Sequence, residues 1–391
     1  MFRFLKIALL IGAIALSACT SITDLKEDMS ERLFGRESNE TPSDLNDIKT
    51  TVPVKVLWNA HLGESYDNDF TAVTENGFVY AASANGEVVK LTVADGKQVW
   101  RINTGERLSG GVGLGENLLF LGTAKGYVIA YDFAGKLIWK SKVSSQVLSA
   151  PKVDYKVLVV RCEDSRIYGL NVADGSRKWV YERATPTLTL RSSAGVTLDG
   201  GAAYAGFAGG KLIALRVEDG KVIWEASVAQ PKGATEIERI ADITSLPVVD
   251  GSLVYAVAYQ GKVAAVDRLT GRIAWSRDIS SYTGLSADGA KVFVSHAVSS
   301  IYALDYSTGK TFWRQGDLKQ RRISAPLPIG NLIAVGDVEG YLHFLNREDG
   351  SFVARIQTDD AAAIMPQMLA VGSSIIIAQD RKGGIYAISI K

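Results

Sequence analysis

Short apolar runs with alternating polar positions recur along residues 51–391. Typical runs are GEVVKLTV (86–93), GKLIALR (210–216) and GKVAAVD (261–267), and the first follows another run, GFVYAAS (77–83). Alternation with a period of two is typical of β-strands that have one face in a core. The repeats lack helical periodicity, so the pattern predicts an all-β fold.

A turn and a tryptophan follow these strands in a regular way. EDGKVIW (218–224) and LTGRIAW (269–275) join a tight turn to a short strand that ends in tryptophan. Asp-Gly and Thr-Gly pairs suit hairpin turns because glycine adopts positive φ at little cost. All seven tryptophans of the chain occupy this position: Trp58, Trp100, Trp139, Trp179, Trp224, Trp275 and Trp313. Their spacing of 38 to 51 residues indicates a repeat architecture of small four-stranded meanders.

The two chain ends complete each other. The last third strand of the repeats ends at Ile390 and has no fourth strand after it, whereas a lone fourth strand ends at Trp58. In EDGSFVA (348–354), Ala354 occupies the tryptophan position. Pairing the two terminal strands closes a ring and removes exposed sheet edges. The sequence therefore predicts an eight-bladed β-propeller over residues 51–391, with one blade built from both ends of the chain.

The N-terminal region has the pattern of a targeting segment. Arg3 and Lys6 precede the apolar run IALLIGAIAL, which is too short to span a bilayer, and the run leads into LSAC at residues 16–19. LSAC resembles a bacterial lipobox, which implies a lipoprotein signal peptide at 1–18 and a lipid on Cys19. Thr20 in the next position implies the outer membrane. The alternative is an ordinary secretory signal with a chance cysteine. Residues 19–50 are polar and aperiodic, so they are expected to form a flexible tether.

Composition excludes several other functions. A net charge of +1 gives no basic field for nucleic acid. Cys162 is expected in the core, and His61, His296 and His343 lack metal-ligand spacing, so no metal site is predicted. The basic cluster KQRR (319–322) is expected to be a solvated loop.

AVDRLTGRIAW (265–275) and ALDYSTGKTFW (303–313) resemble the tryptophan-docking repeat of quinoprotein-like (PQQ-repeat) propellers. The resemblance implies that the seven indoles are structural and pack between neighbouring blades. The quinoprotein dehydrogenases of this type use pyrroloquinoline quinone and Ca²⁺, with adjacent cysteines and a tryptophan stacked on the cofactor. This chain has no adjacent cysteines, and all its tryptophans occupy docking positions. No cofactor and no enzymatic activity are therefore expected.

The signal, tether and propeller together resemble the lipoprotein scaffolds of the outer-membrane β-barrel assembly (Bam) machinery. The resemblance implies a non-catalytic protein on the periplasmic face of the outer membrane that assists the folding and insertion of outer-membrane proteins. Its implied partner is BamA, through the periplasmic POTRA domains, and direct binding of unfolded outer-membrane proteins stays open. The alternatives are a quinoprotein dehydrogenase and a glycan-binding propeller that uses its central channel.

Two stretches resemble the loops through which this family docks on BamA. They are LTLRSSA (188–194) and ATEIERIAD (234–242), and both lie in the longest repeat steps, where binding insertions are common. The implied partner-binding residues are Leu188, Leu190, Arg191, Glu236, Glu238, Arg239 and Asp242. Thr244 departs from the family pattern, which has a second acidic residue there. Alternatively, Leu188 and Leu190 belong to a buried strand and are core.

Overall fold

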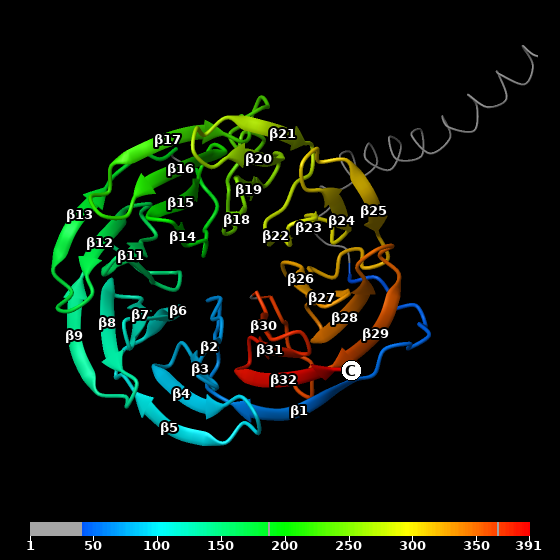
Figure 1. The fold of residues 1–391 in the computed structure, drawn as a ribbon, viewed down its shortest axis with the longest axis horizontal. Helices are drawn as coiled ribbons and strands as arrows, with labels where there is room; N and C mark the ends of the chain where they lie inside the picture. The colour runs from blue at the N-terminus through cyan, green and yellow to red at the C-terminus, as the bar shows by residue number, and fades with distance from the viewer. Residues whose placement is uncertain (1–40, 187, 366) are drawn as a thin grey trace, which may run out of the picture.

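Eight blades surround a central axis in a closed ring (Figure 1). The computed structural model describes residues 41–186, 188–365 and 367–391. The expected signal peptide, Cys19 and the tether up to residue 40 lie outside the described residues. Every blade is a four-stranded antiparallel sheet, which confirms the predicted fold class.

The first four blades in chain order are made of the following strands: β2 (Val73–Glu75), β3 (Phe78–Ala82), β4 (Glu87–Thr92) and β5 (Gln98–Asn103); β6 (Leu108–Gly115), β7 (Leu118–Thr123), β8 (Tyr127–Asp132) and β9 (Leu137–Lys142); β10 (Lys152–Asp154), β11 (Val157–Arg161), β12 (Ile167–Asn171) and β13 (Arg177–Tyr181); β14 (Thr197–Asp199), β15 (Ala202–Phe207), β16 (Lys211–Arg216) and β17 (Val222–Ser227).

The next three blades are made of β18 (Val248–Asp250), β19 (Leu253–Val257), β20 (Val263–Asp267) and β21 (Ile273–Arg277); β22 (Gly284–Ala287), β23 (Lys291–Ser295), β24 (Ile301–Asp305) and β25 (Thr311–Gln315); β26 (Leu327–Ile329), β27 (Leu332–Gly336), β28 (Tyr341–Asn346) and β29 (Phe352–Gln357). The eighth blade joins β30 (Leu369–Val371), β31 (Ile375–Gln379) and β32 (Gly384–Ile390) to β1 (Val54–His61).

The ring closes between the two chain ends, as predicted. β1 pairs antiparallel with β32, so that Val54 lies opposite Ile390 and His61 opposite Gly384. Figure 1 shows the blue N-terminal strand outside the red C-terminal strand. No sheet is left without its fourth strand.

The core lies between the blades. The second and third strands of each blade are almost fully buried, and eight apolar clusters separate neighbouring sheets. Cys162 belongs to one of these clusters, as predicted, and burial raises the pKa of its thiol to about 11. A thiol with a raised pKa in an apolar cluster is a poor nucleophile.

Each tryptophan joins its blade to the next one. Trp224 of β17 donates its indole N–H to the Arg268 carbonyl at 2.8 Å, and Trp275 of β21 donates to the Tyr306 carbonyl at 2.9 Å. The other five indoles make the same type of bond to the following blade, with N···O distances of 2.8 to 3.0 Å. Each indole therefore links two neighbouring blades by a hydrogen bond.

Glycine in the receiving turn makes room for the indole. Gly271 has φ +71°, and a Cβ atom there would lie 2.8 Å from Trp224. An alanine or glycine lies opposite six of the seven tryptophans within the blade, as in the pair of Ala214 with Trp224, whereas Lys90 lies opposite Trp100. Six of the repeats therefore combine an indole, a small residue on the paired strand and a glycine in the turn of the next blade.

The described part of the expected tether is attached to the propeller. We call residues 41–52 the N-terminal strap. Ser43 N–H donates to the Lys319 carbonyl at 3.1 Å, and Thr51 N–H donates to the Val353 carbonyl at 2.9 Å. Leu45 packs against the apolar cluster that contains Trp313. The strap thus lies along the blade formed by β26–β29.

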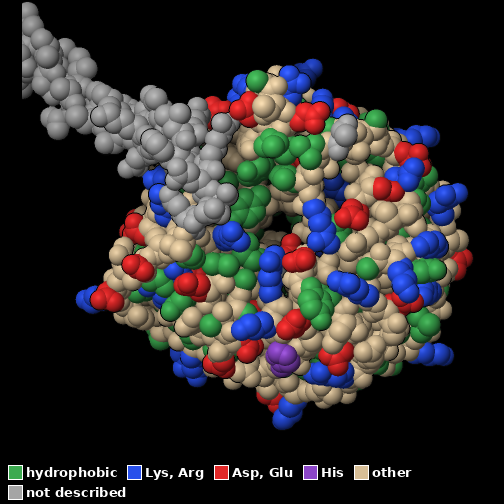
Figure 2. Space-filling view, turned by 180° about the vertical axis from the view of Figure 1, so that it is seen from behind, with side chains coloured by type: hydrophobic (Ala, Val, Ile, Leu, Met, Phe, Trp, Pro, Cys, Tyr) green, Lys and Arg blue, Asp and Glu red, His purple; other side chains and the backbone are tan. Residues whose placement is uncertain are grey.

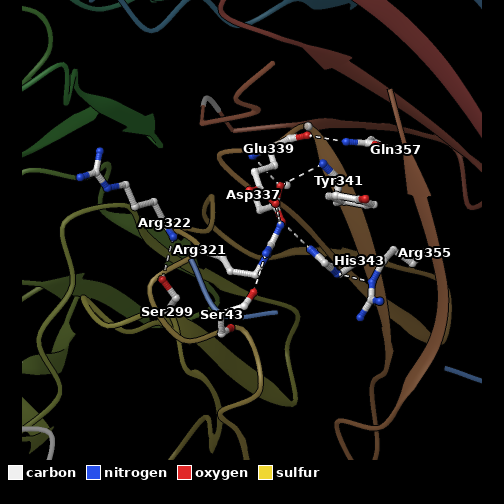
Figure 3. A network of polar contacts seen from close by, with 12 residues as sticks. Ser43, Ser299, Arg321, Arg322, Asp337, Glu339, Tyr341, His343, Arg355 and Gln357 are labelled. Atoms are coloured by element: carbon white, nitrogen blue, oxygen red, sulfur yellow. Dashed lines mark hydrogen bonds and ion pairs between the residues drawn. The ribbon is translucent and has the colours of Figure 1, made fainter. Parts of the chain in front are cut away.

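A buried polar network holds the strap (Figure 3). Asp337 Oδ2 accepts from Arg321 Nε at 2.7 Å and lies 2.9 Å from His343 Nε2. Arg321 Nη1 then reaches the Ser43 carbonyl at 2.7 Å, and Arg355 Nη1 reaches the Asn46 carbonyl at 2.9 Å. Arg321 is only 2% exposed. The expectation that KQRR (319–322) is a solvated loop is therefore wrong for Arg321, because an acidic partner and the strap enclose it.

Candidate partner-binding surface

The two long inter-blade loops form one surface. Residues 182–196 join β13 to β14, and residues 228–247 join β17 to β18. The described residues of the two loops, 182–186, 188–196 and 228–247, contain no strand, so Leu188 and Leu190 do not lie in a buried strand. Long connections carried on rigid blades are suited to binding because they can vary without disturbing the core.

Asp242 ties the two loops together. Its Oδ2 accepts a bond from Leu190 N–H at 2.8 Å, and its Oδ1 accepts one from Gly209 N–H at 3.0 Å. Ser192 Oγ adds a bond to the Thr244 carbonyl at 3.2 Å. Asp242 is 4% exposed, so its carboxylate faces inward. Asp242 therefore positions the two loops relative to each other.

The second loop contains a preformed helical turn. Thr235 Oγ1 accepts from Glu238 N–H at 3.2 Å, and Glu238 Oε2 accepts from Ala234 N–H at 2.9 Å and Thr235 N–H at 3.4 Å. This reciprocal pattern is a capping box, which satisfies backbone donors at the start of a helical turn. Arg239 Nε closes the turn by donating to the Gly233 carbonyl at 3.0 Å. Glu238 and Arg239 therefore shape the turn, while Glu236 is exposed on it.

Two apolar side chains project from these loops. Leu188 is 43% exposed on the first loop, and Ile237 is 66% exposed on the second. Ile237 is not among the residues predicted from the sequence, because the charged residues around it carry the resemblance to a docking loop. The sequence feature that could have identified Ile237 is a large apolar residue with charged residues on both sides, in an inter-blade insertion.

The first loop continues to the centre of the ring. Arg191 donates to the Asp67 carbonyl and to Asn68 Oδ1, both at 3.4 Å, and Ser193 Oγ donates to Asp69 Oδ2 at 2.8 Å. These partners belong to the connection between β1 and β2, more than 120 positions away in the chain. Leu190 is half-buried beside them and lines a central cavity. Leu190 and Arg191 therefore fix the loop across the ring, while Leu188 faces outward.

Thr244 also has an internal partner. Its Oγ1 donates to the Tyr282 carbonyl at 3.1 Å. The hydroxyl thus joins this loop to the connection that leads into β22, and it provides no acidic group to the surface. Within residues 41–186, 188–365 and 367–391, no cluster of His, Cys, Asp and Glu suits a metal ion. The same described ranges contain no helix with the length and apolar character needed to cross a bilayer.

Comparisons with known proteins place the chain in a family. The sequence model described as outer membrane protein assembly factor BamB matches residues 55–108, 84–315 and 298–391. The chain is 41% identical to a protein named outer membrane protein assembly factor BamB from Nitrosomonas eutropha, over 100% of this chain and 96% of that protein. It is 32% identical to the protein of the same name from Escherichia coli K12, over 97% of each chain.

Solved structures agree in fold. The crystal structure of BamB from Moraxella catarrhalis superposes with a TM-score of 0.79 at 27% identity and covers 86% of this chain and 100% of that chain. Quinohemoprotein alcohol dehydrogenase from Comamonas testosteroni reaches a TM-score of 0.70 at 13% identity over 86% of this chain and 76% of that chain, a likeness of fold alone. The family model and the full-length relatives together show that the chain belongs to the BamB family of outer membrane protein assembly factors.

Proposed function

We propose that this chain is a non-catalytic scaffold of the Bam complex that assists the assembly of outer-membrane proteins. Its relatives over the full length are named outer membrane protein assembly factors. All seven indoles are bonded between blades, so no tryptophan is left to stack on a quinone. The likeness to a quinohemoprotein dehydrogenase is too remote to support an enzymatic role.

The proposed docking partner is the POTRA region of BamA. The observation that carries this proposal is the pair of loops locked by Asp242, with Leu188 and Ile237 exposed on them. Exposed apolar side chains on a rigid support are suited to be binding hot spots, because little conformational freedom is lost when they are buried. Glu236 lies beside Ile237 and would influence orientation and association rate more than affinity.

Binding of purified BamA POTRA domains tests this surface. Leu188→Ala and Ile237→Ala are each expected to weaken binding by roughly 2 kcal/mol, with the melting temperature unchanged because both side chains are exposed. Leu137→Ala is the matched control, since Leu137 is an equally exposed leucine on the outer strand β9. Equal affinities for all four proteins would place the interface elsewhere on the ring.

The bonds by which Asp242 positions the two loops predict a second effect at the same surface. Asp242→Asn keeps the size of the side chain but weakens acceptance from the Leu190 and Gly209 N–H groups. Binding is expected to fall without the loss of any contacting side chain. Faster amide hydrogen exchange at Leu190 in this variant would distinguish a positioning role from direct contact.

The proposed location is the periplasmic face of the outer membrane, with a lipid on Cys19 after removal of residues 1–18. The motif LSAC at 16–19 and the following Thr20 support this proposal. Cys19→Ala is expected to release the protein into the soluble periplasmic fraction or to leave its precursor unprocessed. Retention of the variant in washed membranes would contradict the lipid anchor. Residues 19–50 are proposed as the tether, of which 43–46 are held by Arg321 and Arg355.

A further inference from the structure

A cavity of about 500 Å³ lies at the centre of the ring. Its lining comes from the inner strands and connections of most blades, including β6, β10, β22 and the 182–196 loop. Figure 2 shows the ring from behind, with a hollow at its centre and charged side chains around the opening. A cavity of this volume is in the range of small-molecule sites, and it is separate from the outward-facing Leu188 and Ile237.

The described lining carries more positive than negative charge. Its cations are Lys152, Arg191 and Arg381, and its carboxylate is Asp69. Asp69 already accepts from Ser193 Oγ at 2.8 Å and lies 3.6 Å from Arg381 Nη2. Asp69 is thus paired with Arg381, although its Oδ1 has no hydrogen-bond partner among the described residues. Arg191 Nε lies 3.7 Å from Glu163 Oε1, so the positive charge left over in the cavity is that of Lys152.

Lys152 is the unmatched group. It lies on β10 and is half-buried, and its ammonium group has no hydrogen bond or ion pair to any residue that the structure describes. Burial lowers the pKa of its ammonium group, and no acidic group opposes this effect. An isolated ammonium group in such a place is unfavourable until an anion approaches it.

Two further donors in the cavity also lack partners. Ser245 is 7% exposed, and its Oγ has no hydrogen-bond partner among the described residues. Arg381 Nε is likewise buried without a partner in the described ranges. Buried polar groups are nearly always satisfied in folded proteins, so such groups lining one cavity point to a ligand or to bound water.

We propose that the central cavity binds a small organic molecule through a carboxylate group. Lys152 would pair with the carboxylate, while Ser245 Oγ and Arg381 Nε would donate to its oxygens or to neighbouring polar groups. Eight hydroxyl-bearing residues line the rest of the cavity and suit a polar ligand body: Thr71, Ser149, Ser193, Thr244, Ser245, Tyr259, Tyr282 and Thr283. One unpaired ammonium group favours a single negative charge over a multiply charged anion.

Calorimetry with two matched pairs of probes tests the proposal and separates two sources of a carboxylate. N-acetylmuramic acid is compared with the neutral N-acetylglucosamine, and acetyl-trialanine with a free carboxyl end is compared with its amide. The acid of at least one pair is expected to bind at least 10-fold more tightly than its neutral partner. Preference within the sugar pair alone indicates a sugar acid, and preference within the peptide pair alone indicates a polypeptide end.

Variants assign the site to Lys152. Lys152→Met is expected to weaken acid binding at least 10-fold, whereas Lys152→Arg retains most of it because the charge remains. Lys178→Met is the control, since Lys178 is exposed on the outer strand β13. If the acids bind no better than the neutral probes, or if Lys152→Met binds them as the parent protein does, the proposal is overturned. An unchanged melting temperature of Lys152→Met, together with retained binding in Lys152→Arg, excludes misfolding as the cause of a loss.

Discussion

Seven junctions between blades contain a tryptophan, and the eighth contains Ala354. At the seven, the indole rests against the hairpin turn between the third and fourth strands of the next blade. At the eighth, the next blade is built from β32 and β1, which no hairpin connects. The receiving turn and its glycine are therefore missing, and a small residue occupies the position. The way in which the two chain ends close the ring thus explains why alanine, and not tryptophan, occupies the eighth junction.

The eighth junction is held by other contacts. Ala354 is fully buried in an apolar cluster with Tyr386 and Ile388, and strap and β1 residues pack against this cluster. Thr51 N–H bonds to the Val353 carbonyl at this junction, whereas Arg321 and Arg355 hold residues 43–46 of the strap, where Leu45 packs on the neighbouring Trp313 cluster. All eight junctions contain an apolar cluster; seven of them add a docking indole, and the eighth adds contacts from the strap and β1.

The largest expected effect comes from removing a docking indole. Trp224→Ala deletes a buried ring and its bond to the Arg268 carbonyl, so it is expected to cost about 3–5 kcal/mol of unfolding free energy. Ile223→Ala is the control, because Ile223 is exposed beside it on β17. Denaturant unfolding measures both variants. Equal losses of unfolding free energy in the two variants would show that the buried indole contributes no more to stability than an exposed side chain.

Breaking the strap network is expected to cost somewhat less. Arg321→Met leaves the Asp337 carboxylate buried with only His343 and backbone partners, an effect of about 3 kcal/mol. Proteolysis within residues 41–50 is also expected to accelerate, because the Ser43 carbonyl loses its donor. Arg322→Met is the adjacent exposed control. Unchanged stability and proteolysis would mean that the Arg321 network does not hold the strap on the propeller.

A tryptophan introduced at the eighth junction tests whether this junction can receive an indole as the other seven do. Ala354→Trp is expected to destabilise the protein by about 1–3 kcal/mol, because the buried site has no hairpin glycine to receive an indole. Phe312→Trp, at an exposed position of β25, controls for the presence of another tryptophan. A rise in melting temperature for Ala354→Trp would show that the eighth slot is an ordinary docking slot left unfilled.

Acidification is expected to have the smallest effect, and to act through the buried network of Asp337 and His343 beside the Trp313 cluster. Burial lowers the pKa of His343 below its ordinary value of 6.5, so the unfolded chain takes up a proton at a higher pH than the folded one. Stability should then fall as the pH drops below about 6.5, by at most about 1.4 kcal/mol per pH unit for one group. Burial of Asp337 would raise its pKa, but hydrogen bonds from His343, Tyr341 N–H and Arg321 hold it below the usual range. Protonation of Asp337 at lower pH therefore also decreases the stability of the folded protein.

Melting curves between pH 7.5 and 5 measure this effect. His343→Gln removes the titrating ring and is expected to flatten the dependence between pH 6.5 and 5. His61→Gln, which changes an exposed histidine on β1, serves as the control. An identical pH profile in parent and His343→Gln would exclude the network as the source of acid sensitivity.

The sequence by itself determined the ring. The alternation of apolar residues gave the strands, the tryptophan spacing gave the blades, and the unpaired terminal strands required closure between β1 and β32. These features are visible because each depends on local periodicity repeated many times. The two long repeat steps also located the loops that form the candidate surface, although they did not indicate the exposure of Ile237.

The tertiary structure alone decided how residues distant in the chain meet. Asp242 reads as an ordinary acidic loop residue until its carboxylate is seen bonded to Leu190 N–H, 52 positions away. The strap is held through the backbone carbonyls of Ser43 and Asn46. Every residue has a backbone carbonyl, so such contacts cannot be predicted from the residue type. Lys152 looks like any strand lysine, and only the closure of the ring places it, unpaired, in the central cavity. Local pattern fixes strands and turns, but burial and pairing of single polar groups depend on which distant segments enclose them.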